Sequence, residues 1–389
     1  MHVLFLAHSF PRYSGDAAGA FILRLATALG REGVAVRVIA PATNTAPARD
    51  VLDGIPVTRF RYAPRALETL AYEGNMASQV RASWGGKLGL VGLLSAELGS
   101  AMTAMRSEPT DVVHAHWWFP SGVVGTAAAR WRGLPLVTTL HGSDVRLGRV
   151  ILAARPAMRQ VLRRSTRVTA VSGWLAAEAQ LVAGGTMPTV APMPVATELF
   201  TADPAVGRGS ALLFVGRLTR QKGVELLLQA LAMLPPDIAL DVVGDGEERA
   251  PLEALARSLD LSERVRWHGA KPANELAPFY RRAAALVMPS VEEGLGLVAV
   301  EALLCETPVV AFASGGVVDV ISDGETGVLV QDRTPAALAQ AITGLLASPG
   351  VGVALAKRGA ERARDIFSPA HVARRYADIY REAIRDAAR

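Results

Sequence analysis

Cysteine is almost absent: the 389-residue sequence has one, Cys305. A single thiol excludes an internal disulfide framework and fits a reducing compartment, so we expect a cytoplasmic protein. Cys305 stands in the apolar run Ala-Leu-Leu-Cys, and a free cysteine in such a run is typically buried. We therefore predict a buried, unreactive thiol.

Long uninterrupted apolar runs are also missing, although 50% of the residues are hydrophobic and only 20% are charged. That composition excludes a disordered chain, because it can bury ample apolar surface. The most apolar stretch, 88–105, is broken by Glu97 and three glycines, whereas a membrane-spanning helix needs about 18 or more apolar residues in a row. We expect no transmembrane helix. No basic segment precedes the apolar residues after Met1, which we interpret as a first strand and not as a signal peptide.

Two nucleotide-binding signatures and one metal-binding signature are missing as well. The sequence has no Asp-x-Asp pair, the motif that usually binds the metal ion of a nucleotide diphosphate. Residues 14–19, which follow the first predicted strand, do not match G-x-G-x-x-G. The second absence disfavours a nicotinamide enzyme. His114 and His116 share a strand face, but no third ligand with a suitable spacing accompanies them. We predict no metal, and we interpret His116 as a core residue or as part of an acceptor site.

The charge is unevenly distributed between the two halves. Residues 1–200 have 20 Lys and Arg against 12 Asp and Glu, and residues 201–389 have 21 against 24, so the net charges are +8 and −3. The first half should therefore face an acidic partner such as phosphate or lipid headgroups. No zinc spacing or basic helix with interleaved aromatics indicates nucleic acid. The arginines between 149 and 167 form either a solvated face or a patch for anionic membrane or phosphate. They are Arg149, Arg155, Arg159, Arg163, Arg164 and Arg167.

Short β-rich runs alternate with helical patterns along the chain. The predicted strands are residues 3–7, 34–41, 112–116, 134–142, 167–172, 211–216, 238–244, 264–269, 284–290, 307–312 and 327–330. This alternation predicts an α/β fold with parallel sheets and crossover helices. A Pro-rich break between Pro188 and Pro204 interrupts the rhythm, which predicts two sheets.

We therefore expect two Rossmann-like domains, residues 1–196 and 197–367, with a ligand cleft at the carboxyl ends of their strands. Residues 368–389 predict a last helix with Ser368 as N-cap and Pro369 at its first position. We expect this helix to pack near the first domain. Its apolar stripe consists of Val372, Tyr376, Ile379 and Ala383.

Two glutamates give the strongest chemical signal. Glu293 and Glu301 are separated by seven residues, with Gly294 and Gly296 between them. The glycines let backbone amides approach a ligand at the start of a helix. Because helical side chains tilt toward the N-terminus, the carboxylate of Glu301 should point back to the same ligand. Two carboxylates and several amides are suited to bind a polyol such as a sugar or ribose.

Two cations follow the first predicted strand of the second half. Arg217 and Lys222 lie in the segment Val-Gly-Arg-Leu-Thr-Arg-Gln-Lys-Gly, between a strand and a helix. A guanidinium and an ammonium at this place are suited to bind a diphosphate. Arg220 in the same loop is interpreted as solvent-facing.

With these motifs the chain resembles the retaining glycosyltransferases of family 4, which have the GT-B fold. The similarity extends over nearly the whole chain. It rests on Glu293 and Glu301, on Arg217 and Lys222, and on three loop motifs. Those motifs are Val243-Gly244-Asp245-Gly246, Ser314-Gly315-Gly316 and Asp323-Gly324-Glu325-Thr326-Gly327.

The resemblance implies roles for these residues. Glu293 would hold hydroxyls of the donor sugar, Glu301 the ribose, and Arg217 with Lys222 the departing diphosphate. His141, at the end of a first-domain strand, would lie beside the donor sugar and is our first-domain catalytic candidate. The remaining donor-binding candidates are Gly15, Gly294, Leu295, Gly296, Leu297 and Lys271. The acceptor-binding candidates are Asp16, His116 and Asp144, with Asp16 alternatively an N-cap.

The sequence departs from the family pattern at three places. Leu295 replaces the usual aromatic residue, residues 193–196 replace the usual Asn-Gly-Val-Asp, and Glu306 replaces a small residue.

The resemblance implies a retaining enzyme that moves a hexose from a UDP- or GDP-linked sugar to an acceptor hydroxyl, forming an α-glycosidic bond. No obvious side-chain nucleophile is present, so positioning and leaving-group stabilisation would carry catalysis. We expect no cofactor or metal, since Arg217 and Lys222 would neutralise the diphosphate. The acceptor would be a sugar, a lipid-linked molecule or a small molecule. The alternatives are a nucleotide-sugar epimerase of GT-B fold and a non-catalytic nucleotide-sugar-binding protein.

Overall fold

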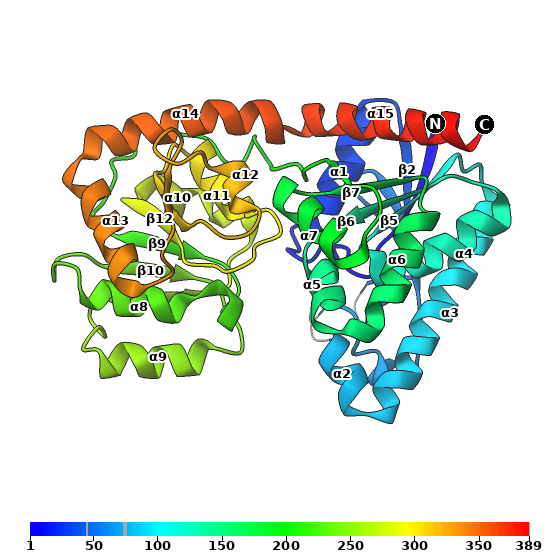
Figure 1. Ribbon diagram of the computed structural model, residues 1–389, viewed down its shortest axis with the longest axis horizontal. Helices are drawn as coiled ribbons and strands as arrows, with labels where there is room; N and C mark the ends of the chain where they lie inside the picture. The colour runs from blue at the N-terminus through cyan, green and yellow to red at the C-terminus, as the bar shows by residue number, and fades with distance from the viewer. Residues whose placement is uncertain (44–45, 73–75, 389) are drawn as a thin grey trace. The chain divides into compact units, whose positions relative to one another are not determined.

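The computed structural model describes residues 1–43, 46–72 and 76–388 and divides the chain into two units (Figure 1). Unit 1 consists of Met1–Pro194 and Pro369–Arg389, and unit 2 of Val195–Ser368. Each unit has its own sheet, all-parallel in unit 2 and parallel except for one edge pair in unit 1, and its own helices.

Unit 1 contains an eight-stranded sheet in the order β3-β4-β2-β1-β5-β6-β7-β8. Its strands are β1 (His2–Leu6), β2 (Ala35–Pro41), β3 (Arg49–Leu52), β4 (Ile55–Phe60), β5 (Val112–His116), β6 (Leu136–Leu140), β7 (Arg167–Ala170) and β8 (Thr189–Val190). All neighbours pair in parallel except β3 and β4. The central strands are almost wholly buried, as expected where helices cover both faces of a parallel sheet.

The helices of unit 1 are α1 (Ala20–Arg31), α2 (Met76–Ala82), α3 (Trp84–Ser107), α4 (Val123–Arg132), α5 (Ser143–Val150), α6 (Arg155–Arg164), α7 (Gly173–Ala183) and α15 (Pro369–Ala387). Three short segments, η1 (Arg65–Leu67), η2 (Trp118–Gly122) and η3 (Leu152–Ala154), complete the connections. The core under α3 and α4 is formed by residues such as Leu4, Leu6 and Val113.

The last helix, α15, belongs to unit 1 and packs against α1. All four residues of its predicted apolar stripe are at most 2% exposed. The hydroxyl of Tyr376 donates to the carbonyl of Ala191 at 3.0 Å, and Arg167 pairs with Asp386 and Glu382. These contacts attach the chain's C-terminal segment to the sheet of unit 1.

Unit 2 contains a six-stranded, all-parallel sheet in the order β11-β10-β9-β12-β13-β14. The strands are β9 (Leu212–Val215), β10 (Leu240–Val243), β11 (Val265–Gly269), β12 (Ala285–Met288), β13 (Val309–Phe312) and β14 (Val328–Val330). The helices are α8 (Val224–Ala232), α9 (Arg249–Ser258), α10 (Ala277–Arg282), α11 (Leu297–Leu304), α12 (Val317–Val320), α13 (Pro335–Ala347) and α14 (Pro349–Phe367), with η4 (Arg220–Lys222) and η5 (Ala273–Glu275).

Two expectations have direct outcomes at this level. Cys305 is buried, as predicted, and burial raises the pKa of its thiol to about 12. The β3–β4 hairpin was not predicted, although Asp53 and Gly54 at its turn both have a positive φ, which is typical of an Asp-Gly hairpin turn.

Candidate functional site

In unit 2 the strand order reverses between β9 and β12, and ligands of such sheets bind where this happens. The loops that follow these two strands contain Lys222 and Glu293. Their side chains form an ion pair in which the ammonium donates to a carboxylate oxygen of Glu293. The pair is mostly buried, at 23% and 12% side-chain exposure. The structure thus brings together two of the four predicted catalytic residues.

Backbone contacts hold these two loops together. Val291 donates its N–H to the carbonyl of Gln221 at 2.9 Å, and the amide of Gln221 donates to the carbonyl of Glu292 at 3.0 Å. Glu292 has a φ of 60°, an uncommon backbone conformation for a residue other than glycine and one that is frequent at functional sites.

Two glycines permit close approach at this place: Gly223 between the loops after β9 and β12, and Gly315 between the loops after β12 and β13. A Cβ on Gly223 would lie 2.2 Å from the carbonyl oxygen of Pro289, and one on Gly315 would lie 2.4 Å from the nitrogen of Glu293. The predicted motif Ser314-Gly315-Gly316 therefore has a structural role. Ser314 accepts the N–H of Glu292 at 3.0 Å, and Gly316 donates to the carbonyl of Glu293 at 2.7 Å.

Glu301 lies on the second turn of α11, as the spacing predicted. Its carboxylate accepts a hydrogen bond from the hydroxyl of Tyr280 at 2.7 Å. Tyr280 is fully buried on α10, and burial together with the charge of Glu301 raises its pKa well above 10. No local pattern in the sequence predicts this contact, because the two residues belong to different helices.

The glycine-containing turn before α11 has the predicted geometry. Gly296 adopts a left-handed φ of 87° and precedes Leu297, the first residue of the helix. Leu295 is only 6% exposed, so it contributes to the core beneath the turn. The N–H of Ala299 donates to the carbonyl of Gly296 at 2.9 Å, which closes the first turn of the helix; the N-terminus of a helix is a place where anions and hydroxyls bind in general.

The other predicted cations of unit 2 differ in their surroundings. Arg217 is an exposed residue that directly follows Gly216 at the end of β9. Arg220 is 91% exposed and pairs with Glu248, consistent with the solvent-facing interpretation. Lys271 follows β11, and its ammonium lies 3.5 Å from a carboxylate oxygen of Glu275.

In unit 1, His141 directly follows β6, and Asp144 organises its loop. One carboxylate oxygen of Asp144 accepts the N–H groups of His141 and Gly142 at 3.1 and 3.0 Å. The other accepts the N–H of Trp118 at 3.1 Å. Asp144 is 3% exposed. Burial raises its pKa, and the backbone hydrogen bonds oppose this shift.

His141 belongs to a cluster of aromatic and imidazole rings. Its Nε2 lies 3.1 Å from Nδ1 of His116, and the ring of Trp117 lies 4.6 Å from the His141 ring. Burial lowers the pKa values of His116 and His141 well below 6.5. Burial also lowers the pKa of His114 to about 3, and its Nδ1 lies 2.8 Å from the hydroxyl oxygen of Tyr380. These imidazoles are therefore neutral at pH 7 and act through hydrogen bonds.

The glycine loop after β1 contains Gly15, which has a φ of 88° and is exposed. Asp16 beside it is not an N-cap, and that alternative was wrong: α1 begins at Ala20 and its N-cap is Gly19. Gly19 allows the end of the loop to lie close to Ser9, since a Cβ on Gly19 would be 2.5 Å from the carbonyl oxygen of Ser9.

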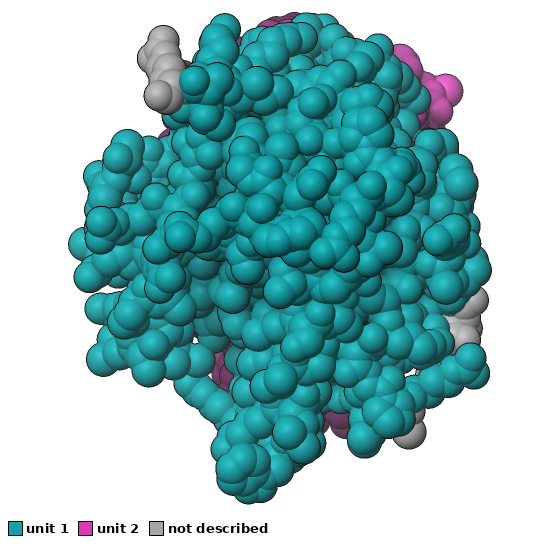
Figure 2. Space-filling view, turned by 90° about the vertical axis from the view of Figure 1, so that its right-hand side faces the viewer, with its two compact units in different colours: residues 1–194, 369–389 teal, residues 195–368 magenta. Residues whose placement is uncertain are grey.

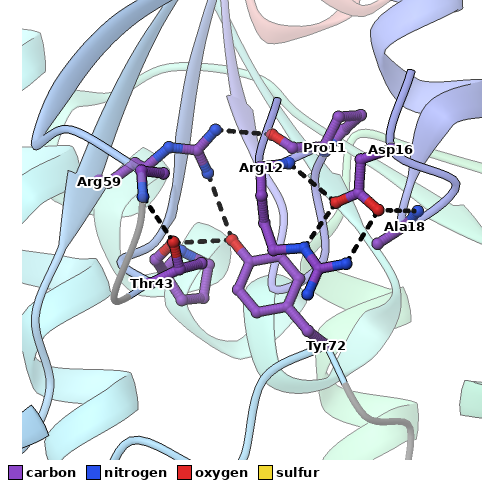
Figure 3. A network of polar contacts seen from close by, with 9 residues as sticks. Pro11, Arg12, Asp16, Ala18, Thr43, Arg59 and Tyr72 are labelled. Atoms are coloured by element: carbon purple, nitrogen blue, oxygen red, sulfur yellow. Dashed lines mark hydrogen bonds and ion pairs between the residues drawn. The ribbon is translucent and has the colours of Figure 1, made fainter. Parts of the chain in front are cut away.

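Asp16 instead forms an ion pair with Arg12, whose side chain donates at 2.6 and 3.0 Å (Figure 3). Burial acts to raise the pKa of Asp16, but the hydrogen bonds from Arg12 and Ala18 lower it below 3.8. Arg59, only 4% exposed, donates to the carbonyl of Pro11 at 2.6 Å and to the hydroxyl of Tyr72 at 3.3 Å. This network attaches the glycine loop to β4.

Four members of the arginine-rich segment 149–167 have partners within unit 1. Arg155 and Arg159 donate to the carbonyls of Gly148 and Ala183 at 3.2 and 2.8 Å. Arg149 lies 3.8 Å from Glu178, and Arg167 pairs with α15 as described above. The segment is therefore largely a structural element of unit 1. Among the described residues, no group of three or more His, Cys, Asp or Glu side chains is arranged to hold a metal ion.

Two family models match the chain: a glycosyl transferase 4-like domain over residues 17–196 and glycosyl transferases group 1 over residues 198–365. The D-inositol 3-phosphate glycosyltransferase of Xylanimonas cellulosilytica is 32% identical over 408 aligned positions, which cover 96% of this chain and 93% of the relative. The protein of the same name from Kineococcus radiotolerans is 33% identical over 420 positions, with coverage of 96% and 93%.

Solved structures agree with the fold. Sucrose-phosphate synthase from Thermosynechococcus elongatus has a TM-score of 0.82 at 24% identity and covers 98% of both chains. HepE of Anabaena, solved with UDP-glucose, has a TM-score of 0.74 at 22% identity, with coverage of 97% and 99%. The predicted α/β fold with two Rossmann-like sheets is thus confirmed.

Proposed function

Since the chain belongs to the glycosyl transferases group 1 of glycosyltransferase family 4, and is a glycosyltransferase of GT-B fold, we propose that it moves a hexose from a nucleotide diphosphate sugar to an acceptor hydroxyl with retention of the α configuration. The observation that supports the proposal most is the Lys222–Glu293 pair at the sheet reversal of unit 2. In this pair the ammonium of Lys222 can bind a diphosphate, and the adjacent carboxylate of Glu293 can accept hydrogen bonds from sugar hydroxyls.

We assign the donor to unit 2. Glu293 accepts hydroxyls of the sugar, and Glu301, held by Tyr280, accepts hydroxyls of the ribose. Lys222 and Arg217 neutralise the diphosphate as the bond to the sugar breaks, which stabilises the leaving group. Before the donor binds, the ion pair keeps Lys222 and Glu293 together at the place where they act.

We assign the reacting hydroxyl to the surroundings of His141. A neutral imidazole can donate or accept one hydrogen bond at each nitrogen, and the contact with His116 occupies Nε2. Asp144 positions the His141 backbone and acts through it. The reaction then proceeds on one face of the sugar, with a diphosphate oxygen accepting the proton of the incoming hydroxyl.

The experiment is a transfer assay with UDP- and GDP-linked hexoses. The acceptor panel begins with D-inositol 3-phosphate, the molecule in the names of the relatives, and continues with simple sugars and lipid-linked sugars. Nucleoside diphosphate and glycoside formed in equal amounts support the proposal. Isomerisation of the nucleotide sugar without an acceptor would show an epimerase instead, and binding without release would show a non-catalytic protein.

A further inference from the structure

Helix α3 presents an apolar face that the described residues of unit 1 leave uncovered. The helix is long and apolar enough in composition to cross a membrane, yet most of its apolar stretch is not buried. Trp84, Leu88 and Val91 are 78%, 70% and 61% exposed. Their spacing places them on one side of the helix, where they form an apolar stripe along its first two turns.

The other sides of α3 pack closely: opposite the stripe, Leu93 and Glu97 are fully buried. A Cβ on Gly86 would lie 2.3 Å from the carbonyl oxygen of Gln79 in α2, and one on Gly92, beside the stripe, would lie 2.2 Å from that of Tyr62. The amide of Gln79 in turn donates to the carbonyl of Thr69 at 3.0 Å. The stripe is therefore displayed on a helix that neighbouring elements hold in place.

We call residues 76–91, which comprise α2 and the first turns of α3, the α2–α3 tip. Figure 1 places this segment at the lower end of unit 1, and the same end protrudes in the surface view of Figure 2. Its ionisable side chains are Arg81 and Lys87, both exposed. The ammonium of Lys87 lies 4.5 Å from the centre of the Trp84 ring. Farther along α3, the acid Glu97 is fully buried.

We propose that the α2–α3 tip docks this enzyme on an anionic lipid bilayer, inserting Trp84, Leu88 and Val91 among the acyl chains while Arg81 and Lys87 contact the headgroups. An apolar stripe flanked by cations and anchored by an exposed tryptophan is the pattern of interfacial helices. Lys87 can extend its charge to the headgroup level while its methylenes cover the Trp84 ring.

Charge favours a bilayer over a second copy of the chain as the occupant. Two copies meeting through this tip would bring Arg81 and Lys87 of both together, and like charges at an interface are unfavourable. An anionic membrane compensates both charges and covers the apolar stripe at the same time. The arginine-rich segment 149–167 is less suited to this role, because most of its guanidinium groups have partners within unit 1.

The test is co-sedimentation of the full chain with vesicles of phosphatidylcholine, with and without about a third phosphatidylglycerol. Binding is expected only with phosphatidylglycerol, and it should weaken as salt rises. Leu88→Ser should lower the partition coefficient about tenfold, because the variant loses the favourable free energy of burying a leucine side chain among the acyl chains. The matched control is Leu181→Ser on α7, where Leu181 is 82% exposed, and it should bind as the wild type does.

A second pair of variants tests the charges. Lys87→Glu should weaken binding strongly, whereas Arg164→Glu, also on an exposed residue, should not. Equal losses in both variants, unchanged binding of Leu88→Ser, or no binding at all would overturn the proposal. Self-association of the wild type that Leu88→Ser abolishes would show that a second copy covers the stripe. The assay needs no sugar donor, so its outcome is independent of the proposed transfer reaction.

Discussion

At the scale of single residues, the site of unit 2 depends on contacts between side chains that are distant in sequence. Lys222 meets Glu293, and Tyr280 meets Glu301. The sequence predicted Lys222, Glu293 and Glu301 as site residues. Which side chain each of them contacts is determined by the fold. Two predictions test the pairs separately.

Lys222→Ala should lower kcat/KM about 100-fold or more while the protein stays folded, because the departing diphosphate loses a preorganised cation. The matched control is Arg220→Ala in the same short helix, since Arg220 is 91% exposed. Steady-state kinetics of both variants check the prediction. Equal activity of the two variants would remove Lys222 from the mechanism.

Tyr280→Phe should weaken donor binding about tenfold and change kcat much less, because Glu301 loses the hydrogen bond that orients its carboxylate. Calorimetric titration with the nucleoside diphosphate measures this directly. Unchanged affinity, with only the melting temperature lowered, would make Tyr280 a purely structural residue.

At the scale of secondary-structure elements, the sequence predicted the main strands of both sheets but missed the β3–β4 hairpin. The buried central strands are nearly continuous apolar runs, whereas β3 at the edge of the sheet is the segment Arg-Asp-Val-Leu, in which only Leu52 is buried. The N-cap expected at Asp16 was also wrong. The loop continues to Gly19, which lies close to the carbonyl of Ser9 and directly precedes the first residue of α1.

The role of Tyr280 and the pairing of the arginines in 149–167 could not be predicted either. Both depend on which helix packs beside which, and no local spacing encodes that information. In contrast, the E-x7-E spacing predicted the place of Glu301 on α11 because a turn and a helix suffice to determine it.

Helix α3 makes a pH-dependent contribution to stability that can be measured. Burial raises the pKa of Glu97 to about 8, whereas the unfolded chain releases this proton near the ordinary value of 4.5. The unfolded state therefore binds fewer protons than the native state between these values, and stability falls as pH rises through that window.

Glu97→Gln should remove the fall in stability with rising pH, because glutamine has no proton to release in this range. Relative to the wild type, the free energy of unfolding of the variant should rise by about 3 kcal/mol between pH 5 and pH 7. Urea denaturation of both proteins at the two pH values gives the difference. A difference that does not change with pH would show that Glu97 ionises normally in the native state.

At the scale of the whole molecule, the residues proposed to act in the reaction come from both units. Unit 2 holds the cations and carboxylates for the donor, and unit 1 holds His141 with its neutral imidazole neighbours. The assignment of the diphosphate charge to Arg217 and Lys222 has a consequence for the intact enzyme: transfer should proceed without a divalent metal.

Turnover should keep at least about 80% of its rate when EDTA replaces added Mg²⁺ or Mn²⁺, because side-chain cations already neutralise the leaving group. Initial rates with and without the chelator check this expectation. Loss of activity in EDTA and its return with one metal would transfer the neutralising role to that ion.

The most direct test of the central claim is to follow the complete reaction by proton NMR, with the α-linked nucleotide sugar and an accepted hydroxyl compound. We expect an α-linked glycoside and one nucleoside diphosphate for each sugar transferred, and Lys222→Ala should slow the formation of both about 100-fold or more. A β-linked product, or a change in the nucleotide sugar without an acceptor, would contradict the claim.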